Sequence, residues 1–272
     1  MKSNYRYIVK AFMAMAVIAG TTSCDDFLDR EPMSSISPET YYSTAAQLEA
    51  NLNDEYPNVL PSFGQWTYGI FGEDKGTDNQ IEVNANDRYT QDRWKVPHSE
   101  SDNWKFERIY RINFFLSEAL PKFGEDMSGS QNTISGSVAT IKHYIGEMYF
   151  LRAYEYFKKL QLFGDFPIIN QPLADEMEAL REASKRFPRN EVARFIISDL
   201  DKAYAYMSDV DMATTRINKD AAMLVKSRVA LFEATWLQNF KGTAFVPGGE
   251  GWPGASLHNN YQYPSGNLDN EV

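Results

Sequence analysis

The sequence predicts a mainly α-helical fold built from pairs of helices. Apolar side chains recur every three or four residues in five segments, the spacing that gathers them on one face of a helix. Capping residues precede these segments, and glycine or proline often follows them. The alternation typical of strands is weak, and only residues 81–83 and 167–169 suggest β-structure. Helix pairs at intervals of about 30 to 40 residues are typical of tetratricopeptide-like solenoids, although the strict repeat signature is absent.

The first predicted helix begins at a capping box. Thr44 and Gln47 have the spacing in which each side chain bonds the other residue's backbone. An apolar stripe with a period of four then runs from Leu48 to Leu60. Pro57 and Pro61 are expected to bend or end this helix.

Four more helices are predicted, over residues 104–123, 137–162, 190–207 and 218–236. Asn190 and Asn218 are the expected N-caps of the last two. The longest ends at Phe-Gly-Asp-Phe-Pro, because glycine terminates a helix and proline cannot continue it. Trp104 and Trp236 lie on apolar stripes and are expected in the core. Glu147 and Arg152 are expected to form a structural ion pair within the longest helix.

The N-terminus has the composition of an export signal. Basic residues precede an apolar run over residues 11–20, and small polar residues lead to Cys24. Residues 1–23 are therefore predicted as a signal peptide, because the run is shorter than the about 20 residues that span a bilayer. We expect lipid attachment at Cys24 and a tether over 24–37. The alternative is that Cys24 only ends an ordinary signal, since the large apolar residue of a lipobox is missing.

Composition excludes some classes of ligand. The formal net charge is −10. Removal of residues 1–23 takes away basic but no acidic side chains, so the mature chain is more acidic still and nucleic-acid binding is disfavoured. Aromatic residues make up 14% of the chain. Such rings fill cores, and they also stack on the flat faces of ligands. Because the acidity argues against bases, carbohydrate remains the favoured ligand.

No motif indicates catalysis, a metal or a cofactor. The three histidines lack metal-ligand spacing. Residues 249–254 match GxGxxG, but they follow no predicted strand, and Pro253 stands where a helix would open. Asp74, Asp78 and Asn79 offer oxygen ligands for calcium without the EF-hand order.

The long segment 62–102 contains the candidate ligand residues. It has no helical period, and about 40 residues is long for a connection, so it is expected to be functional. Glycan binding needs rings that cover the C–H faces of sugars beside side chains that bond hydroxyls. The candidates are Trp66, Tyr68, Asp78, Asn79, Arg93 and Trp94. The alternative is that the aromatic members pin the segment to the helices. Trp252 is a candidate start of another ligand loop.

Four sequence blocks, in this order, resemble the SusD/RagB family of outer-membrane lipoproteins. The first is Cys24-Asp-Asp-Phe-Leu-Asp, and the second is Trp104-x5-Tyr110-x-x-Asn113. The third is the stretch 146–167, from Gly-Glu-Met-Tyr-Phe-Leu-Arg-Ala-Tyr to Phe-Gly-Asp-Phe-Pro. The fourth comprises Arg189 and the segments 196–203 and 218–231.

The resemblance implies a SusD-like α/α superhelix and a non-enzymatic role. The protein would be a surface-exposed, lipid-anchored outer-membrane subunit of a Bacteroidetes-type uptake complex. It would capture oligosaccharide for a SusC-like TonB-dependent transporter, with part of its ligand surface in segment 62–102. Asp25 and Asp26 are similar to the surface-export signals of such lipoproteins. The alternatives are a surface glycoside hydrolase, or a peptide-binding or structural member of the same kind of complex.

Members of this family are typically much longer than this chain. We therefore expect an N-terminal helical domain over 38–240 and the start of an incomplete C-terminal region over 241–272. The chain resembles a fragment or a truncated gene product. A truncated core is expected to expose apolar helix faces, and such exposure disfavours folding of the chain on its own.

Overall fold

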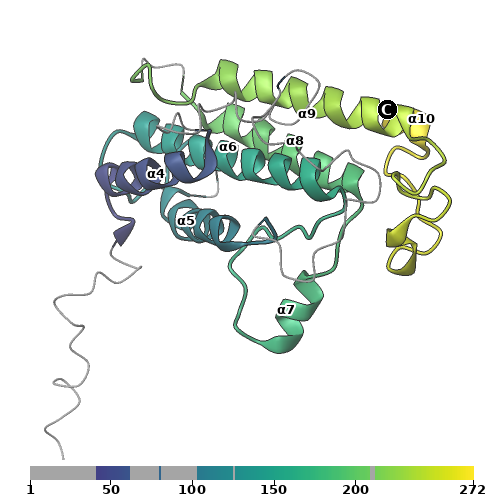
Figure 1. Ribbon diagram of the computed structural model, residues 1–272. Coiled ribbons are helices and arrows are strands. Elements are labelled where there is room, and N and C mark those ends of the chain that lie inside the picture. The colour runs from purple at the N-terminus through teal and green to yellow at the C-terminus, as the bar shows by residue number, and fades with distance from the viewer. Residues whose placement is uncertain (1–40, 62–79, 81–102, 125, 209–211) are drawn as a thin grey trace, which may run out of the picture. The chain divides into compact units, whose positions relative to one another are not determined.

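The computed structural model describes residues 41–61, 80, 103–124, 126–208 and 212–272. Those from Tyr42 onward belong to one compact unit. Its helices (Figure 1) are α4 (Ala45–Val59), α5 (Glu107–Phe123), α6 (Val138–Phe163), α7 (Met177–Ala183), α8 (Arg189–Tyr206), α9 (Lys219–Asn239), the 3₁₀ helix η3 (Pro253–Ser256) and α10 (Leu268–Glu271). The predicted mainly α-helical fold is confirmed.

No sheet forms among these residues, which contain only isolated bridges such as Phe166 with Phe187. The β-structure suggested for 167–169 is wrong. Pro167 has no N–H to donate, and the N–H and C=O of Ile169 both bond the hydroxyl of Tyr156 instead of a second strand. The other suggestion, 81–83, lies outside the described residues.

Helix α6 is the centre of the unit and packs against α4, α5 and α8 (Figure 1). Almost every side chain from Ile141 to Leu160 is buried, as expected for a helix that is covered on all sides. Gly146 permits the close approach of α8. A Cβ atom there would lie 2.9 Å from the carbonyl oxygen of Ala203.

Buried polar contacts fix how α6 meets its neighbours. Arg152 forms two bonds with the Asp199 carboxylate on α8, of 2.6 and 2.8 Å. One turn further along α6, the ring of Tyr156 meets that of Phe195, one turn earlier on α8, so the two helices are antiparallel. Arg152 also donates to the side-chain oxygen of Asn113 on α5, at 2.9 Å.

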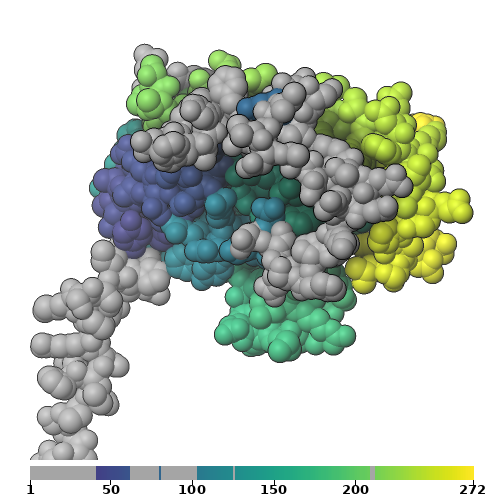
Figure 2. All heavy atoms as spheres, in the orientation of Figure 1, coloured from purple at the N-terminus to yellow at the C-terminus, as the bar shows by residue number. Residues whose placement is uncertain are grey.

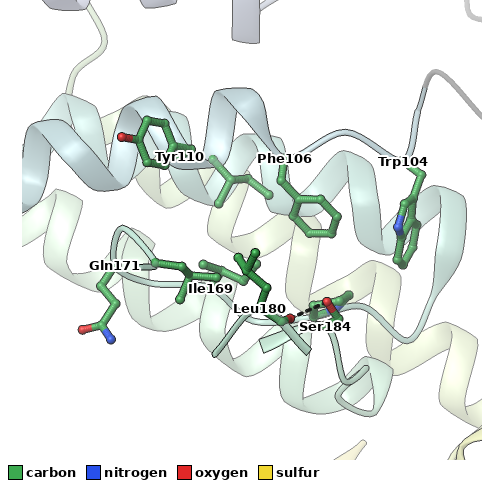
Figure 3. Close-up of a pocket in the computed structure, with 10 residues that line it drawn as sticks. Trp104, Phe106, Tyr110, Ile169, Gln171, Leu180 and Ser184 are labelled. Atoms are coloured by element: carbon green, nitrogen blue, oxygen red, sulfur yellow. Dashed lines mark hydrogen bonds between the residues drawn. The ribbon is translucent and has the colours of Figure 1, made fainter. Parts of the chain in front are cut away.

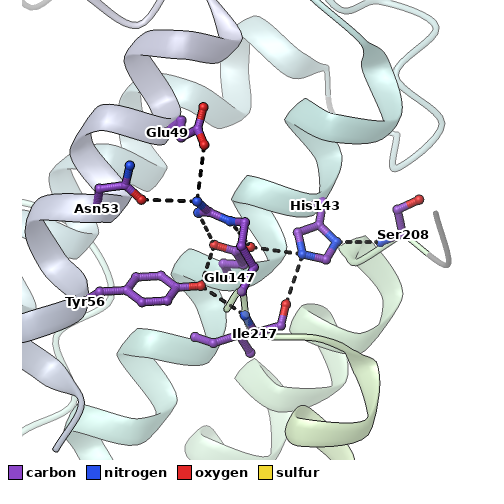
Figure 4. A network of polar contacts seen from close by, with 8 residues as sticks. Glu49, Asn53, Tyr56, His143, Glu147, Ser208 and Ile217 are labelled. Atoms are coloured by element: carbon purple, nitrogen blue, oxygen red, sulfur yellow. Dashed lines mark hydrogen bonds and ion pairs between the residues drawn. The ribbon is translucent and has the colours of Figure 1, made fainter. Parts of the chain in front are cut away.

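The predicted ion pair between Glu147 and Arg152 is wrong. Residues five apart lie about 140° apart around a helix, so the two side chains reach different neighbours. Glu147 accepts bonds from Arg216, at 2.8 and 2.5 Å, and from the Tyr56 hydroxyl of α4 (Figure 4). Burial, and then the Glu147 charge, raise the pKa of Tyr56, so its hydroxyl remains a donor.

His143 joins this network from one turn earlier on α6. Its Nδ1 accepts the N–H of Ser208 at 3.2 Å, so Nε2 is the ring nitrogen that can donate. Nε2 is 3.0 Å from both the Ile217 carbonyl oxygen and a Glu147 oxygen (Figure 4). The network therefore connects α4, α6 and the residues that precede α9.

The predicted helix starts are partly correct. Thr44 and Gln47 form the capping box, and Asn218 caps α9. Helix α4 continues through Pro57 and ends at Val59. Asn190 is not a cap, because α8 begins at Arg189, two residues earlier than that cap implies. The N–H of Arg189 bonds the carboxylate of Asp165. The buried side chain of Asn190 bonds the Tyr261 hydroxyl instead of capping the helix.

Residues 241–272 form turns and two short helices that pack against the ends of α6 and α8. The indole N–H of Trp252 donates to Asp165 at 2.8 Å. Near the end of the chain, Glu271 accepts two bonds from Arg194 on α8, of 2.6 and 2.8 Å. None of the described helices combines the length and apolar content needed to cross a membrane.

The Asp199 carboxylate is expected to be essential for stability. Asp199→Ala leaves the buried Arg152 charge without its anion, so we expect a loss of about 3–5 kcal/mol in the free energy of unfolding, measured by urea titration. Asp201→Ala is the matched control on the same helix. Its ion pair with Lys226 is more exposed and should contribute at most about 1 kcal/mol. Equal losses in the two variants would contradict the central role of Arg152.

The attachment of residues 261–272 should depend on pH. Burial raises the pKa of Glu271, but bonds from Arg194, Ser265 and Asn190 outweigh it and lower the pKa to about 2. The ionised carboxyl therefore stabilises the fold above its ordinary pKa of 4.5, and this contribution is lost as pH falls from 4.5 toward 2.

Urea titrations of the wild type and Glu271→Gln at several pH values test this. The stability difference between the two proteins should shrink through that pH range. A difference that stays constant from pH 6 to pH 2.5 would argue against it.

Candidate functional site: an aromatic pocket beside α5

The residues predicted to bind lipid or glycan lie outside the described residues. These are Cys24, Trp66, Tyr68, Asp78, Asn79, Arg93 and Trp94. Their roles remain predictions. The described residues nevertheless form an aromatic pocket, and several of its lining residues directly follow segment 62–102 in the sequence.

This aromatic pocket, of about 270 Å³, lies between the start of α5, the segment 167–173 and α7 (Figure 3). Its walls are mainly apolar and include three aromatic rings. The lining residues are Trp104, Phe106, Ile109, Tyr110, Pro167, Ile169, Gln171, Leu173, Leu180 and Ser184.

Segment 167–173 is held in place by the core. Helix α6 ends at Gly164, whose φ of +68° suits a glycine better than any other residue. The Tyr156 hydroxyl then bonds the N–H and C=O of Ile169 at 2.8 and 3.0 Å. The amide of Asn113 donates to the same C=O, and Arg152 donates to the C=O of Asn170. Contacts from α5 and α6 therefore fix this wall of the pocket.

The aromatic wall is also supported from behind. Trp104 makes edge contacts with Phe163 and Phe166, with ring centroids 4.9 Å apart in each case. Phe106 stacks on Phe166 at 5.2 Å. Tyr110 lies one turn further along α5 and is 50% exposed. Trp104 was expected on the helix, but α5 begins only at Glu107, and Trp104 is half-buried at the pocket.

Helix α7 forms the outer wall. It has no buried residue, and it stands out from the neighbouring atoms in the space-filling view (Figure 2). Leu180 faces the pocket, and the Ser184 hydroxyl donates to the Leu180 carbonyl oxygen at 2.6 Å (Figure 3). No helical period predicted this helix.

The polar groups at the aromatic pocket are few and uncharged. They are the Gln171 amide, the Tyr110 and Ser184 hydroxyls and the indole N–H of Trp104. Ligand sites typically combine apolar walls with a small number of such groups. An aromatic wall accepts the flat C–H face of a sugar ring, while amides and hydroxyls bond its hydroxyl groups. The aromatic pocket therefore has the chemistry of a subsite for a neutral sugar unit.

A second cavity, of about 430 Å³, lies at the end of α6 between α8, α9 and residues 244–257. Several of its polar groups already have partners within the protein. Arg189 bonds Glu233 through both carboxylate oxygens, and the Trp236 N–H donates to Phe245. Trp252, predicted to start another ligand loop, is only 5% exposed and bonded to Asp165, so it belongs to the core.

Burial raises the pKa of Asp165, which lines this cavity, and of Glu233, which bonds Arg189. Within the described part of the chain, no three His, Cys, Asp or Glu side chains are grouped to hold a metal ion.

The sequence contains a signal for the aromatic pocket in the aromatic residues at 104, 106 and 110, around the start of α5. The apolar stripe that begins at Trp104 predicts that residue in the core, whereas it lines the pocket. The sequence of segment 167–173 did not indicate that it forms a wall of the pocket. The position of this segment depends on bonds from residues elsewhere in the chain.

Comparison with known proteins identifies the family. A SusD-like family model, described as starch-binding and associating with the outer membrane, matches residues 26–231. SusD-like protein P25 of Formosa agariphila is 25% identical over 233 residues, which cover 79% of this chain and 41% of that protein. SusD-like protein P2 of the same bacterium is 25% identical over 253 residues, covering 89% and 46%.

A solved structure agrees on the fold. The crystal structure of a SusD-like protein from Bacteroides fragilis is 21% identical, with a TM-score of 0.55 over 78% of this chain and 39% of that one. The chain spans less than half the length of these relatives. The family match extends from before α4 into α9, and this chain belongs to the SusD-like family.

Proposed function

We propose that this protein captures an oligosaccharide at the cell surface and delivers it to a SusC-like TonB-dependent transporter. The observation that carries the proposal is the aromatic pocket, with its three rings and uncharged polar groups. The family's description as starch-binding and associating with the outer membrane supports the same role.

The size of the aromatic pocket limits what it holds. Pockets for drug-sized ligands have volumes of about 300–1,000 Å³, and this pocket is slightly smaller than that range. It therefore takes one sugar unit, and the rest of the oligosaccharide lies outside it. In this proposal Trp66, Tyr68, Asp78, Asn79, Arg93 and Trp94 contact the neighbouring units. Affinity then results from several weak contacts.

Capture also requires attachment to the membrane. We propose that Cys24 carries the lipid and that residues 24–37 serve as the tether. A tethered protein stays within reach of the transporter barrel while the protein opens and closes over it. Delivery of a bound ligand requires such movement without loss of contact.

Tyr110→Ala tests the aromatic pocket. Tyr110 is half-exposed, so its removal should leave the fold intact and weaken glycan binding by the loss of one ring contact. Such a contact contributes about 0.5–1.5 kcal/mol, which corresponds to a two- to tenfold rise in Kd. Calorimetry of the full chain with a panel of neutral oligosaccharides, starting with malto-oligosaccharides, measures it.

Tyr204→Ala, an exposed tyrosine of α8, is the matched control and should change no Kd. No heat with any glycan would count against the capture role, and release of shorter products during incubation would favour a hydrolase.

Cys24→Ala tests the anchor. The wild type should incorporate labelled palmitate and fractionate with the outer membrane. The variant should lose the label and appear in the soluble fraction, since a lipid chain supplies the membrane affinity. A variant that retains the palmitate label would refute attachment at Cys24.

A further inference from the structure

The outer wall of the aromatic pocket is an excursion of the chain between two points that are bonded to the core. The chain leaves the core at Asn170, whose carbonyl oxygen accepts a bond from Arg152 at 3.2 Å. It returns at Phe187, which exchanges two backbone bonds with Phe166, of 3.0 and 3.1 Å. Residues 174–185, which include α7, form a flap between these two anchors.

The polar contacts of the flap stay within it. Its hydrogen bonds and ion pairs reach no other residue in the described part of the chain. They include those of Ser184 with Leu180, Lys185 with Glu182 and Arg181 with Glu178. No residue of the flap is buried, and α7 makes no extensive contact with another described helix (Figure 1). The flap is therefore attached to the core by its two ends and by the side chains that face the pocket.

Leu180 is the large apolar side chain with which the flap faces the aromatic pocket (Figure 3). It lies across the pocket from Phe106 and is 39% exposed. Met177, one turn earlier on α7, is 83% exposed and does not line the pocket. The two residues therefore differ in position while both are apolar and unburied.

A segment with few buried contacts opens at a low cost in free energy. The inner wall of the pocket is bonded to the core at Ile169 and Asn170, so movement is left to the flap. A ring in the aromatic pocket would cover the exposed part of Leu180 only while the flap is closed. A ligand shifts an equilibrium between two states when it binds one of them better, and this contact supplies the difference.

We infer that residues 174–185 open to admit a sugar unit into the aromatic pocket and then close on it, with Leu180 contacting the ring from the outer side. This inference rests on the proposed function. Closure of a flap encloses a ligand and must be reversed before the ligand leaves. The contact of Leu180 therefore acts mainly on the rate of dissociation.

Distances between spin labels test the movement. Cys24 is the only cysteine of the chain, so the full chain with Cys24→Ala accepts one label at Glu178→Cys on the flap and one at Ser117→Cys on α5, both exposed positions. The free protein should show a broad distribution of distances, which a bound neutral oligosaccharide should narrow. Labels at Ser117→Cys and Tyr204→Cys, on two core helices, are the matched control. They should show one narrow distribution with and without the ligand.

Leu180→Ala tests the contact with the ligand. Loss of this partly covered side chain should raise the dissociation rate of the oligosaccharide about fivefold and leave the association rate nearly unchanged, as measured by surface plasmon resonance. Met177→Ala, on the same helix, should change neither rate. Circular dichroism checks that both variants keep the fold.

The outcomes separate this inference from the proposed function. If calorimetry detects oligosaccharide binding but the labels on α5 and the flap give one narrow distribution in the free protein, the flap is overturned and glycan capture stands. A broad distribution that the bound ligand does not narrow has the same consequence. Equal dissociation rates for Leu180→Ala and Met177→Ala overturn the role of Leu180. No heat with any oligosaccharide overturns the proposed function, and closure on a sugar is overturned with it.

Discussion

The guanidinium of Arg152 is the group on which most of the described structure depends. It lies inside α6, where a lone charge would be very costly. Two bonds to Asp199 neutralise it and hold α8. Further donors reach Asn113 on α5 and the carbonyl oxygen of Asn170. One buried cation therefore sets the relation of three helices and a connecting segment, and the apolar packing fills the space around it.

The aromatic pocket inherits its geometry from this arrangement. Its inner wall is the segment that begins at Pro167, and the bonds from Arg152, Asn113 and Tyr156 all end on Ile169 or Asn170. The rings of the opposite wall rest on Phe166, which belongs to the same turn. This irregular inner wall is thus tied to the core beneath it, which would limit the entropy lost if a ligand binds there.

Residues 103–110 give the molecule two kinds of surface within one short stretch. Apolar rings face the aromatic pocket, and charged side chains face a separate, polar pocket. In the proposed capture role, the rings would supply contact area for a sugar of suitable shape.

The sequence by itself determined the five long helices, several of their ends and the family. Local rules were sufficient there, because the capping box at Thr44, the stop at Gly164 and the apolar periods depend on neighbours within a few residues. It also suggested carbohydrate as the ligand, from composition. It failed wherever a partner comes from far along the chain. Asp165, 24 residues away, caps α8 in place of Asn190. Arg152 pairs with Asp199 instead of Glu147, because helix geometry directs the two residues to different neighbours. Trp104 lines a pocket whose other wall is positioned by Tyr156. Only the tertiary structure decided these contacts, since each depends on which helices meet and on which buried polar groups must satisfy one another.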